Sequence, residues 1–171
     1  ENMTVNIDKS GNQFSGLFGI VGGGIIKNTG VVNSNVTAHS DVGGVVGYNF
    51  TNGRVNACYH ASGSVSGANF VGGVVGNTDH RLTACYNASG DVTSKGDFVG
   101  SVAGYNSSII TACYWSNYDG NGIGINDGTG TPTKVDGTTV TWQTAVDAMN
   151  AALQYSEWRY ALTGALPTLK K

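Results

Sequence analysis

Three cysteines recur at one position of a repeated pattern, and their thiols are the side chains that most directly suggest a metal or redox site. Cys58, Cys85 and Cys113 each lie between an alanine and a tyrosine. A zinc site needs a fourth ligand, usually from a second Cys-x-x-Cys or a histidine pair, and neither spacing is present. Equivalent positions in stacked strands lie about 4.8 Å apart, farther than the Cβ separation of about 3.8 Å in a disulfide. We therefore predict a ladder of free, small side chains, and no metal or cofactor.

The run Asp79-His80-Arg81 is the main cluster of charged side chains. Arg54 is the repeat equivalent of Arg81, so we expect the two arginines to lie near each other. Glycan-cleaving enzymes need grouped carboxylates and bases, whereas the equivalent loops of other copies read Thr51-Asn52-Gly53 and Asn106-Ser107-Ser108. The pattern predicts a protein that is not an enzyme. A carbohydrate-active enzyme would instead require a groove with two carboxylates, at least one of them from Asp79, Asp91, Asp97 or Asp119.

A stretch of oxygen-bearing residues begins at Asp119 and reads Asp-Gly-Asn-Gly-Ile-Gly. It starts like a calcium-binding loop, but Gly130 stands where the acidic residue near the end of such a loop is required. A turn rich in glycine and asparagine is the favoured interpretation, and calcium binding at residues 119–128 stays open as the alternative.

A tyrosine follows each of the three cysteines, at Tyr59, Tyr86 and Tyr114. Because side chains of a strand alternate between its faces, Val55 and Tyr59 are predicted on the core side. The same alternation turns the intervening residues outward: Asn56, Cys58 and His60. Packing in the core or at its rim is favoured for the tyrosines over an aromatic platform for sugars or peptides.

These residues belong to a unit of about 28 residues that occurs four times. Its first block reads Gly-Gly-Val-Val-Gly at 43–47 and 72–76, and recurs more weakly at 15–19 and 100–104. The closing glycines are separated by 28, 29 and 28 residues. A second block contains the Ala-Cys-Tyr sequence, and a third reads Gly-Ser-Val-Ser at 63–66. Agreement of three blocks over four copies indicates a repeat architecture.

The repeat predicts an all-β fold, a short parallel β-helix or β-solenoid of about four rungs. Its apolar runs are short, β-branched and bounded by Gly, Asn, Asp and Ser, which is typical of strands. One unit cannot bury its own apolar side, so stacking of successive units supplies the core. The adjacent Val45 and Val46 face opposite sides of a regular strand; either the strand is bulged there or both faces are covered.

The last part of the chain departs from the repeat. Apolar residues at helical spacing predict a helix over 141–153, and residues 158–169 predict one or two short strands around a turn at Gly164. We expect this segment to cover the last rung, because exposed strand edges promote aggregation. The expected organisation is a lead-in strand or cap at 1–13, repeats at 14–41, 42–70, 71–98 and 99–116, a Gly/Thr-rich loop region at 117–140, and a C-terminal helix and strand cap at 141–171.

Composition excludes some classes of partner. The net charge is −2 and only 12% of residues are charged, with nine scattered basic residues, which argues against nucleic acid as a partner. No apolar run of about 18 residues is present, so no membrane insertion is expected in this segment. The N-terminal residues lack the features of a secretion signal, which would have been removed or lie outside this sequence. The polar, weakly charged composition favours an extracellular location.

The Gly-Leu-Phe-Gly sequence at 16–19 and the Gly-Val-Val-Gly sequences at 44–47 and 73–76, each leading to an Ala-Cys-Tyr or equivalent block, resemble the GLUG-motif repeats of bacterial surface proteins. The resemblance covers residues 14–116. It implies an extracellular, non-catalytic module, as found in bacterial adhesins and beside the catalytic domain of IgA-cleaving metallopeptidases, including proteins of Bacteroides-type bacteria. The peptidase motif His-Glu-x-x-His is absent from this sequence.

The functional expectation is an adhesion, binding or spacer module of a bacterial cell-surface protein, with host glycan or surface protein as partner. The alternative is an accessory domain of a larger secreted enzyme such as a peptidase, so a larger parent protein is a further expected partner. Because the repeated residues are explained by stacking, specificity should lie where the copies differ. The candidate ligand-binding residues are Arg54, His60, Asp79, His80, Arg81, Asn87 and Trp115.

Overall fold

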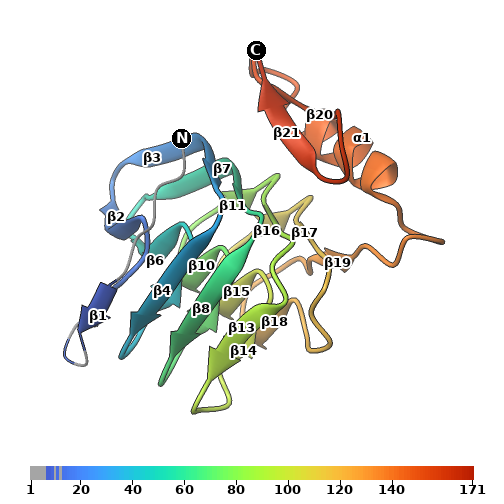
Figure 1. Ribbon diagram of the computed structural model, residues 1–171. Coiled ribbons are helices and arrows are strands. Elements are labelled where there is room, and N and C mark those ends of the chain that lie inside the picture. The colour runs from blue at the N-terminus through green and yellow to red at the C-terminus, as the bar shows by residue number, and fades with distance from the viewer. Residues whose placement is uncertain (1–6, 10, 12) are drawn as a thin grey trace.

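The repeats stack as coils of a parallel β-solenoid of about four turns in the computed structural model, which describes residues 7–9, 11 and 13–171 (Figure 1). Strands of successive coils pair in parallel at equivalent positions. Val46 lies opposite Val75, and Val75 lies opposite Ala103, so each coil continues the register of the one before. The predicted all-β class and the small C-terminal helix are both confirmed.

Three sheets and one short ladder run along the solenoid. The β4 sheet contains, in spatial order, β1 (Ile7–Lys9), β4 (Ser34–Ala38), β8 (Gly63–Gly67) and β13 (Asp91–Ser94). The β6 sheet contains β18 (Ile123–Asn126), β15 (Ala103–Asn106), β10 (Val75–Thr78), β6 (Val46–Phe50) and β2 (Phe18–Gly22). The β7 sheet contains β16 (Ile110–Thr111), β11 (Leu82–Thr83), β7 (Arg54–His60), β12 (Tyr86–Asn87), β17 (Tyr114–Trp115) and β19 (Thr133–Lys134), and β3 (Ile25–Val31) pairs with β7. The short ladder contains β14 (Val99–Gly100), β9 (Val71–Gly72) and β5 (Val42–Gly43).

The paired valines of the repeat both face the interior because the chain turns between β5 and β6. The backbone N–H groups of Val45 and Val46 both donate to the carbonyl oxygen of Val74, each at 3.0 Å. Val74 and Val75 donate in the same way to Val102 of the next coil. Two successive residues thus share one partner, as in a bulge. Of the two alternatives considered for Val45 and Val46, a bulged strand is therefore the one that the structure shows. Val45, Val46, Val74 and Val75 are fully buried in one cluster.

The closing glycine of the repeat lies against the backbone of the neighbouring coil. A Cβ atom on Gly76 would meet the carbonyl carbon of Asp41 at 2.3 Å and the nitrogen of Val42 at 2.4 Å. Neither atom can move without displacing a paired strand. Close backbone approach, therefore, requires glycine at this position.

The alternation predicted for β7 fails at Ala57, which has a left-handed backbone conformation with φ of 50°. Ala84 and Ala112 have φ of 53° and 49° in the next coils. This conformation costs a residue with a side chain about 1–2 kcal/mol, and it reverses which side chains face inward. Cys58 consequently joins Val55 in the interior cluster. The predicted outward orientation of Cys58 is wrong.

The segment 117–140, expected as a loop region, extends the solenoid. β18 pairs with β15 and β19 pairs with β17, both in parallel. Gly124 takes the place of the closing glycine in this coil, because a Cβ there would meet the nitrogen of Val99 at 2.7 Å. The backbone therefore repeats once more after the sequence pattern has faded.

The C-terminal unit consists of α1 (Trp142–Ala152) and an antiparallel pair formed by β20 (Arg159–Leu162) and β21 (Pro167–Lys170). Thr141 caps the helix by accepting from the N–H of Thr144. The unit lies on the side of the solenoid formed by the β7 sheet (Figure 1). The expected position over the last rung is wrong, because the unit covers the tyrosine ladder instead.

The tyrosines anchor this unit in a second buried cluster, outside the solenoid interior. The rings of Tyr59 and Tyr86 stack with centroids 4.9 Å apart, and Trp142 packs edge-on against Tyr86. Tyr160 donates from its hydroxyl to the carbonyl oxygen of Ala84 at 2.9 Å, and Tyr86 donates to that of Pro167 at 2.5 Å. Packing of the tyrosines was predicted correctly, but the prediction that Tyr59 shares the core side of Val55 is wrong, because the tyrosines pack under the C-terminal unit and not among the valines.

Part of the lead-in expected at 1–13 lies outside the described residues. Within it, β1 pairs in parallel with β4, where Ile7 lies opposite Val36. None of the helices formed by the described residues has the length and apolar character needed to cross a membrane.

Candidate ligand-binding cleft

Three of the candidate binding residues are buried inside the solenoid, so the outward orientation predicted for His60 and the ligand-binding role predicted for all three are wrong. His60 and Asn87 are 0% exposed and Trp115 is 9% exposed. The left-handed alanine just before them turns the end of each strand inward. Trp115 packs against the valine interior.

His60 and Asn87 form a polar network within the apolar interior. His60 Nε2 lies 3.0 Å from Ser34 Oγ, and its Nδ1 lies 3.1 Å from Asn87 Oδ1. Asn87 in turn donates to Ser101 Oγ at 3.0 Å. The order serine, histidine, asparagine is that of a nucleophilic triad. All three side chains are inaccessible to solvent, however, and burial lowers the pKa of His60, so the network joins coils and offers no site to a substrate.

The cysteines form the predicted ladder of free side chains, and all three are buried. The backbone N–H of Cys58 lies 3.4 Å from Cys85 Sγ, and the N–H of Cys85 lies 3.4 Å from Cys113 Sγ. Burial raises the pKa of the Cys85 thiol well above its usual range. The thiols thus act as packing groups and weak hydrogen-bond partners between coils.

The charged run Asp79-His80-Arg81 is divided between two faces. The carboxylate of Asp79 turns toward the β6 sheet, where it accepts from the hydroxyls of Tyr48 and, at 2.8 Å, Ser107. Burial and this hydrogen bond raise the pKa of Tyr48 to about 12. The Asp79 carboxylate therefore lies apart from the hollow that His80 and Arg81 line.

His80 and Arg81 meet Arg54 at a small polar hollow of about 160 Å³, which Asn52 and Gly53 complete. Arg81 lies opposite Arg54 in the next coil, since the N–H of Val55 donates to the carbonyl oxygen of Arg81 at 3.1 Å. Three of the seven candidate residues thus come together here, from two loops in which the copies differ.

A larger cleft of about 600 Å³ begins at the other side of Arg54 and separates the solenoid from the C-terminal unit. Its solenoid wall is formed by Lys27, Asn28, Arg54 and Asn56. Its opposite wall is formed by the end of α1 and the turn that follows: Ala152, Leu153, Tyr155, Ser156, Glu157 and Trp158. Tyr155 is 95% exposed, although an aromatic side chain gains free energy from being covered.

The aromatic wall is held in place by Arg159. Its guanidinium donates to the carbonyl oxygens of Leu153 at 2.6 Å, Trp158 at 3.1 Å and Gln154 at 3.3 Å, and also to that of Ser156. The turn that carries Tyr155 and Trp158 is therefore preorganised. Both aromatic residues and Lys27 were absent from the predicted binding residues, because no sequence signal shows where the C-terminal unit docks.

The cleft and the adjoining hollow concentrate positive charge. Lys27, Arg54 and Arg81 are three of the nine basic residues of a chain with net charge −2. Along the described part of the chain, the two ion pairs join Lys134 to Asp119 and Lys171 to Glu157, so none of these three cations has a carboxylate partner. The basic residues are less scattered than the sequence suggests.

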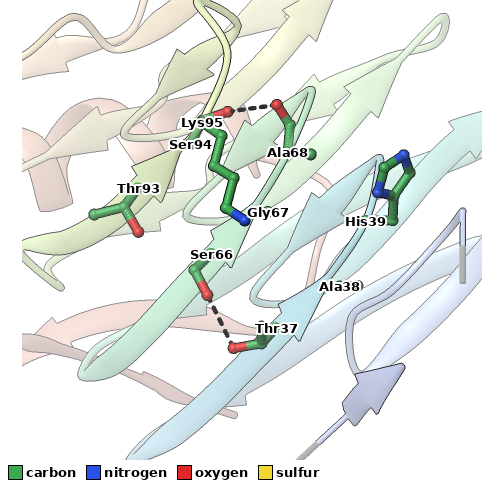
Figure 2. A pocket seen from close by; sticks show the side chains of 9 residues that line it. All are labelled: Thr37, Ala38, His39, Ser66, Gly67, Ala68, Thr93, Ser94 and Lys95. Atoms are coloured by element: carbon green, nitrogen blue, oxygen red, sulfur yellow. Dashed lines mark hydrogen bonds between the residues drawn. The ribbon is translucent and has the colours of Figure 1, made fainter. Parts of the chain in front are cut away.

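A second groove of about 400 Å³ lies on the β4 sheet (Figure 2). Hydroxyl side chains from three coils line it, and Thr37 Oγ1 lies 2.9 Å from Ser66 Oγ. The side chain of Lys95 extends across the floor toward Gly67, with His39 at the other end (Figure 2). Thr37 and Ser66 are hydrogen-bonded to each other and Ser94 to the backbone, and no Phe, Tyr or Trp ring lines the groove, so it offers a ligand less than the cleft.

Paired carboxylates are not gathered in these hollows. Glu157 is the one carboxylate in the 600 Å³ cleft, and Asp91 is the one carboxylate in a further hollow that Ala165 also lines. The groove on the β4 sheet and the polar hollow at Arg54 contain no carboxylate. Asp119 pairs with Lys134 at 3.7 Å and Asp127 accepts from Tyr105 at 2.9 Å, at the two ends of the stretch considered for calcium. Within the described residues, no three His, Cys, Asp or Glu side chains are grouped as metal ligands.

Comparison with known proteins gives one partial match. Over 73 residues, which are 42% of this chain, the sequence is 38% identical to Halomucin of Haloquadratum walsbyi. The matched part covers 1% of Halomucin, so this chain spans a very small part of the length of that relative. No family model and no solved structure matches the chain.

Proposed function

We propose that this chain is a non-catalytic binding module of an extracellular or cell-surface protein, and that it binds a glycan in the cleft between the solenoid and the C-terminal unit. The observation that carries the proposal is the pairing of two walls with different chemistry. Tyr155 and Trp158 form an aromatic wall, and Lys27, Arg54 and Asn56 face it with hydrogen-bond donors.

This combination suits a sugar. One face of a pyranose ring carries C–H groups and packs on an aromatic ring, while the hydroxyls at its edge need fixed donors and acceptors. The volume of the cleft, about 600 Å³, lies within the usual range for small-ligand sites, about 300–1,000 Å³. Because Arg159 fixes the backbone of the aromatic turn, that backbone needs no ordering when a ligand binds.

The location is supported by sequence. The similarity to a protein named Halomucin and the GLUG-like repeats both favour a surface protein, and a bacterial adhesin is the finer proposal. The same repeats make a spacer role the alternative, in which the cleft binds nothing.

A glycan array tests the proposal. The intact chain is compared with Tyr155→Ala, whose side chain is almost fully exposed, so the substitution should leave the fold unchanged. Phe50→Ala is the matched control, since Phe50 is also exposed but lies on the β6 sheet away from the cleft. We expect selective glycan binding that Tyr155→Ala weakens at least tenfold and Phe50→Ala leaves within twofold. Absence of binding to any glycan, or binding that Tyr155→Ala does not change, would refute the proposal.

A further inference from the structure

We infer that the ligand of this cleft carries a negative charge, a carboxylate or sulfate group of an acidic glycan, and that Arg54 and Arg81 bind this group. The inference rests on the proposed function and adds the chemical class of the ligand. It arises from the position of the two arginines relative to each other and to the aromatic wall.

The two arginines are stacked. Their backbones belong to adjacent coils of the β7 sheet and lie about 4.8 Å apart, the spacing of paired strands. Like charges directly opposite each other in a sheet are destabilising. In the flanking coils the equivalent positions are Ile25, beside Arg54, and Ile109, beside Arg81. Stacking at this position therefore does not itself require arginine. A like-charged pair without a carboxylate partner is the arrangement that an anion would stabilise.

The loops that carry the pair are held rigidly. The carbonyl oxygen of His80 accepts from Asn49 Nδ2 at 3.1 Å and from Thr78 Oγ1 at 2.5 Å. The N–H of Arg54 donates to the carbonyl oxygen of Gly24 at 2.9 Å. At Gly53 a Cβ would come within 2.2 Å of Asn49 Oδ1, so the turn before Arg54 packs closely against this anchor. Both backbones are thus fixed, so the two guanidinium groups extend from anchored positions in adjacent coils.

Arg54 joins the charged hollow to the aromatic cleft, because it lines both. A sugar ring against Tyr155 and Trp158 can therefore place an acidic substituent at the arginine pair. Guanidinium groups bind carboxylate and sulfate through paired hydrogen bonds, which gives geometric selectivity as well as charge. Glu157 is the one carboxylate of the cleft, and it pairs with Lys171 at 3.1 Å on the opposite wall.

A glycan is a better match than a nucleic acid. A nucleic-acid site needs cations spaced along a phosphate backbone, whereas in the cleft and hollow the cations Lys27, Arg54 and Arg81 lie next to one aromatic wall. The size of the charged hollow, about 160 Å³, suits one acidic group.

Matched polymers test the inference with the full chain. Polygalacturonate and its methyl ester share one backbone and differ in whether the carboxyl groups are charged, and dextran sulfate and dextran differ in sulfate. A single-stranded DNA oligonucleotide supplies a polyanion of another class. The variants are Arg54→Gln with Arg81→Gln for the pair, Tyr155→Ala for the aromatic wall, and Lys95→Gln as a control that removes one charge from the β4-sheet groove.

We expect at least one charged polymer to bind at least tenfold more tightly than its neutral counterpart at about 150 mM salt, and more weakly as salt rises. The arginine double variant should remove this preference, while Lys95→Gln should leave it within twofold. The member of each pair that binds shows whether carboxylate or sulfate is preferred.

Three other outcomes would contradict, in turn, the negative charge of the ligand, its assignment as a glycan, and the proposed function. Equal binding of charged and neutral glycans, unchanged in the arginine double variant, would overturn the charge inference and leave the glycan proposal standing. Arginine-dependent binding of DNA as tight as that of the charged glycan would overturn the assignment of a glycan. Failure of every polymer and of the glycan array would refute the proposed function itself.

Discussion

The interior of the solenoid and the surface under the C-terminal unit are both well buried, but they are constructed on different principles. In the interior, one residue type occupies the same position in successive coils, as Val45 and Val74 do, and each coil bonds the next through the same atoms. Under the C-terminal unit, stacked Tyr59 and Tyr86 meet residues that occur once, such as Trp142 and Tyr160. Repeated contacts in the interior hold the coils together as a scaffold. The interface, in contrast, forms where the C-terminal unit docks once on the solenoid, and the cleft lies between the two.

The largest effect should come from breaking the interior at a closing glycine. In Gly76→Ala the new Cβ meets backbone atoms at 2.3 and 2.4 Å, and neither can move without separating two coils. We expect a loss of more than about 4 kcal/mol in the free energy of unfolding, enough to prevent folding of many domains. Circular dichroism and thermal melting measure it.

Gly164→Ala is the control for that substitution, because a Cβ there has no atom within 4 Å. Its melting temperature should stay close to that of the unchanged chain. If Gly76→Ala melts at the same temperature as Gly164→Ala, close packing of coils at the closing glycine is not what the repeat requires.

A smaller loss in the free energy of unfolding should follow acidification, because His60 is buried in the interior. Burial lowers the pKa of His60 below its usual value of about 6.5, so the unfolded chain takes up a proton at a pH where the folded chain does not. The stabilisation is complete above about pH 6.5 and is lost as the pH falls through that value, by at most about 1.4 kcal/mol per pH unit. Burial raises the pKa of Asp41, which acts in the opposite direction, since protonation of that carboxyl favours the folded chain.

Urea unfolding at pH 7.0, 6.0 and 5.0 measures this loss. In His60→Gln, which can still hydrogen-bond to Ser34 and Asn87, the loss between pH 7.0 and 5.0 should be smaller. An equal loss in both proteins would show that titration elsewhere is responsible.

The smallest effect should be confined to the interface. Tyr160→Phe removes the hydroxyl that donates to the Ala84 carbonyl at 2.9 Å, which should cost about 1 kcal/mol. Hydrogen exchange should accelerate in α1, β20 and β21 and stay unchanged in the β6 sheet. Faster exchange in both regions would mean that the solenoid and the C-terminal unit unfold as one, so that the interior and the interface do not differ in stability.

The solenoid could be predicted from sequence because its determinants are local and repeated. The glycine and valine block recurs every 28 or 29 residues, and stacking is the one arrangement that buries it in every copy. The helix could also be predicted from sequence, because Ala145, Val146 and Met149 follow helical spacing and are its buried residues.

The cleft was harder to predict for a definable reason. A single left-handed residue, Ala57, reverses the inside and outside of everything after it, and alanine gives no signal of that conformation. His60 was therefore placed outside and Cys58 with it. Arg54 precedes the reversal, and its position as an outward neighbour of Arg81 follows the alternation. Tyr155 and Trp158 depend on where the C-terminal unit docks, which only tertiary contacts decide.

The hydroxyl of Tyr160 joins residues far apart in the chain, and this has a mechanical consequence. A pull on the C-terminus loads the contacts at Ala84 and Pro167 first, because the coils themselves are linked by many parallel hydrogen bonds. The C-terminal unit should peel away before any coil opens, releasing about 100 Å of chain. Tension would thus take apart the aromatic wall of the cleft while the scaffold that carries Arg54 stays folded.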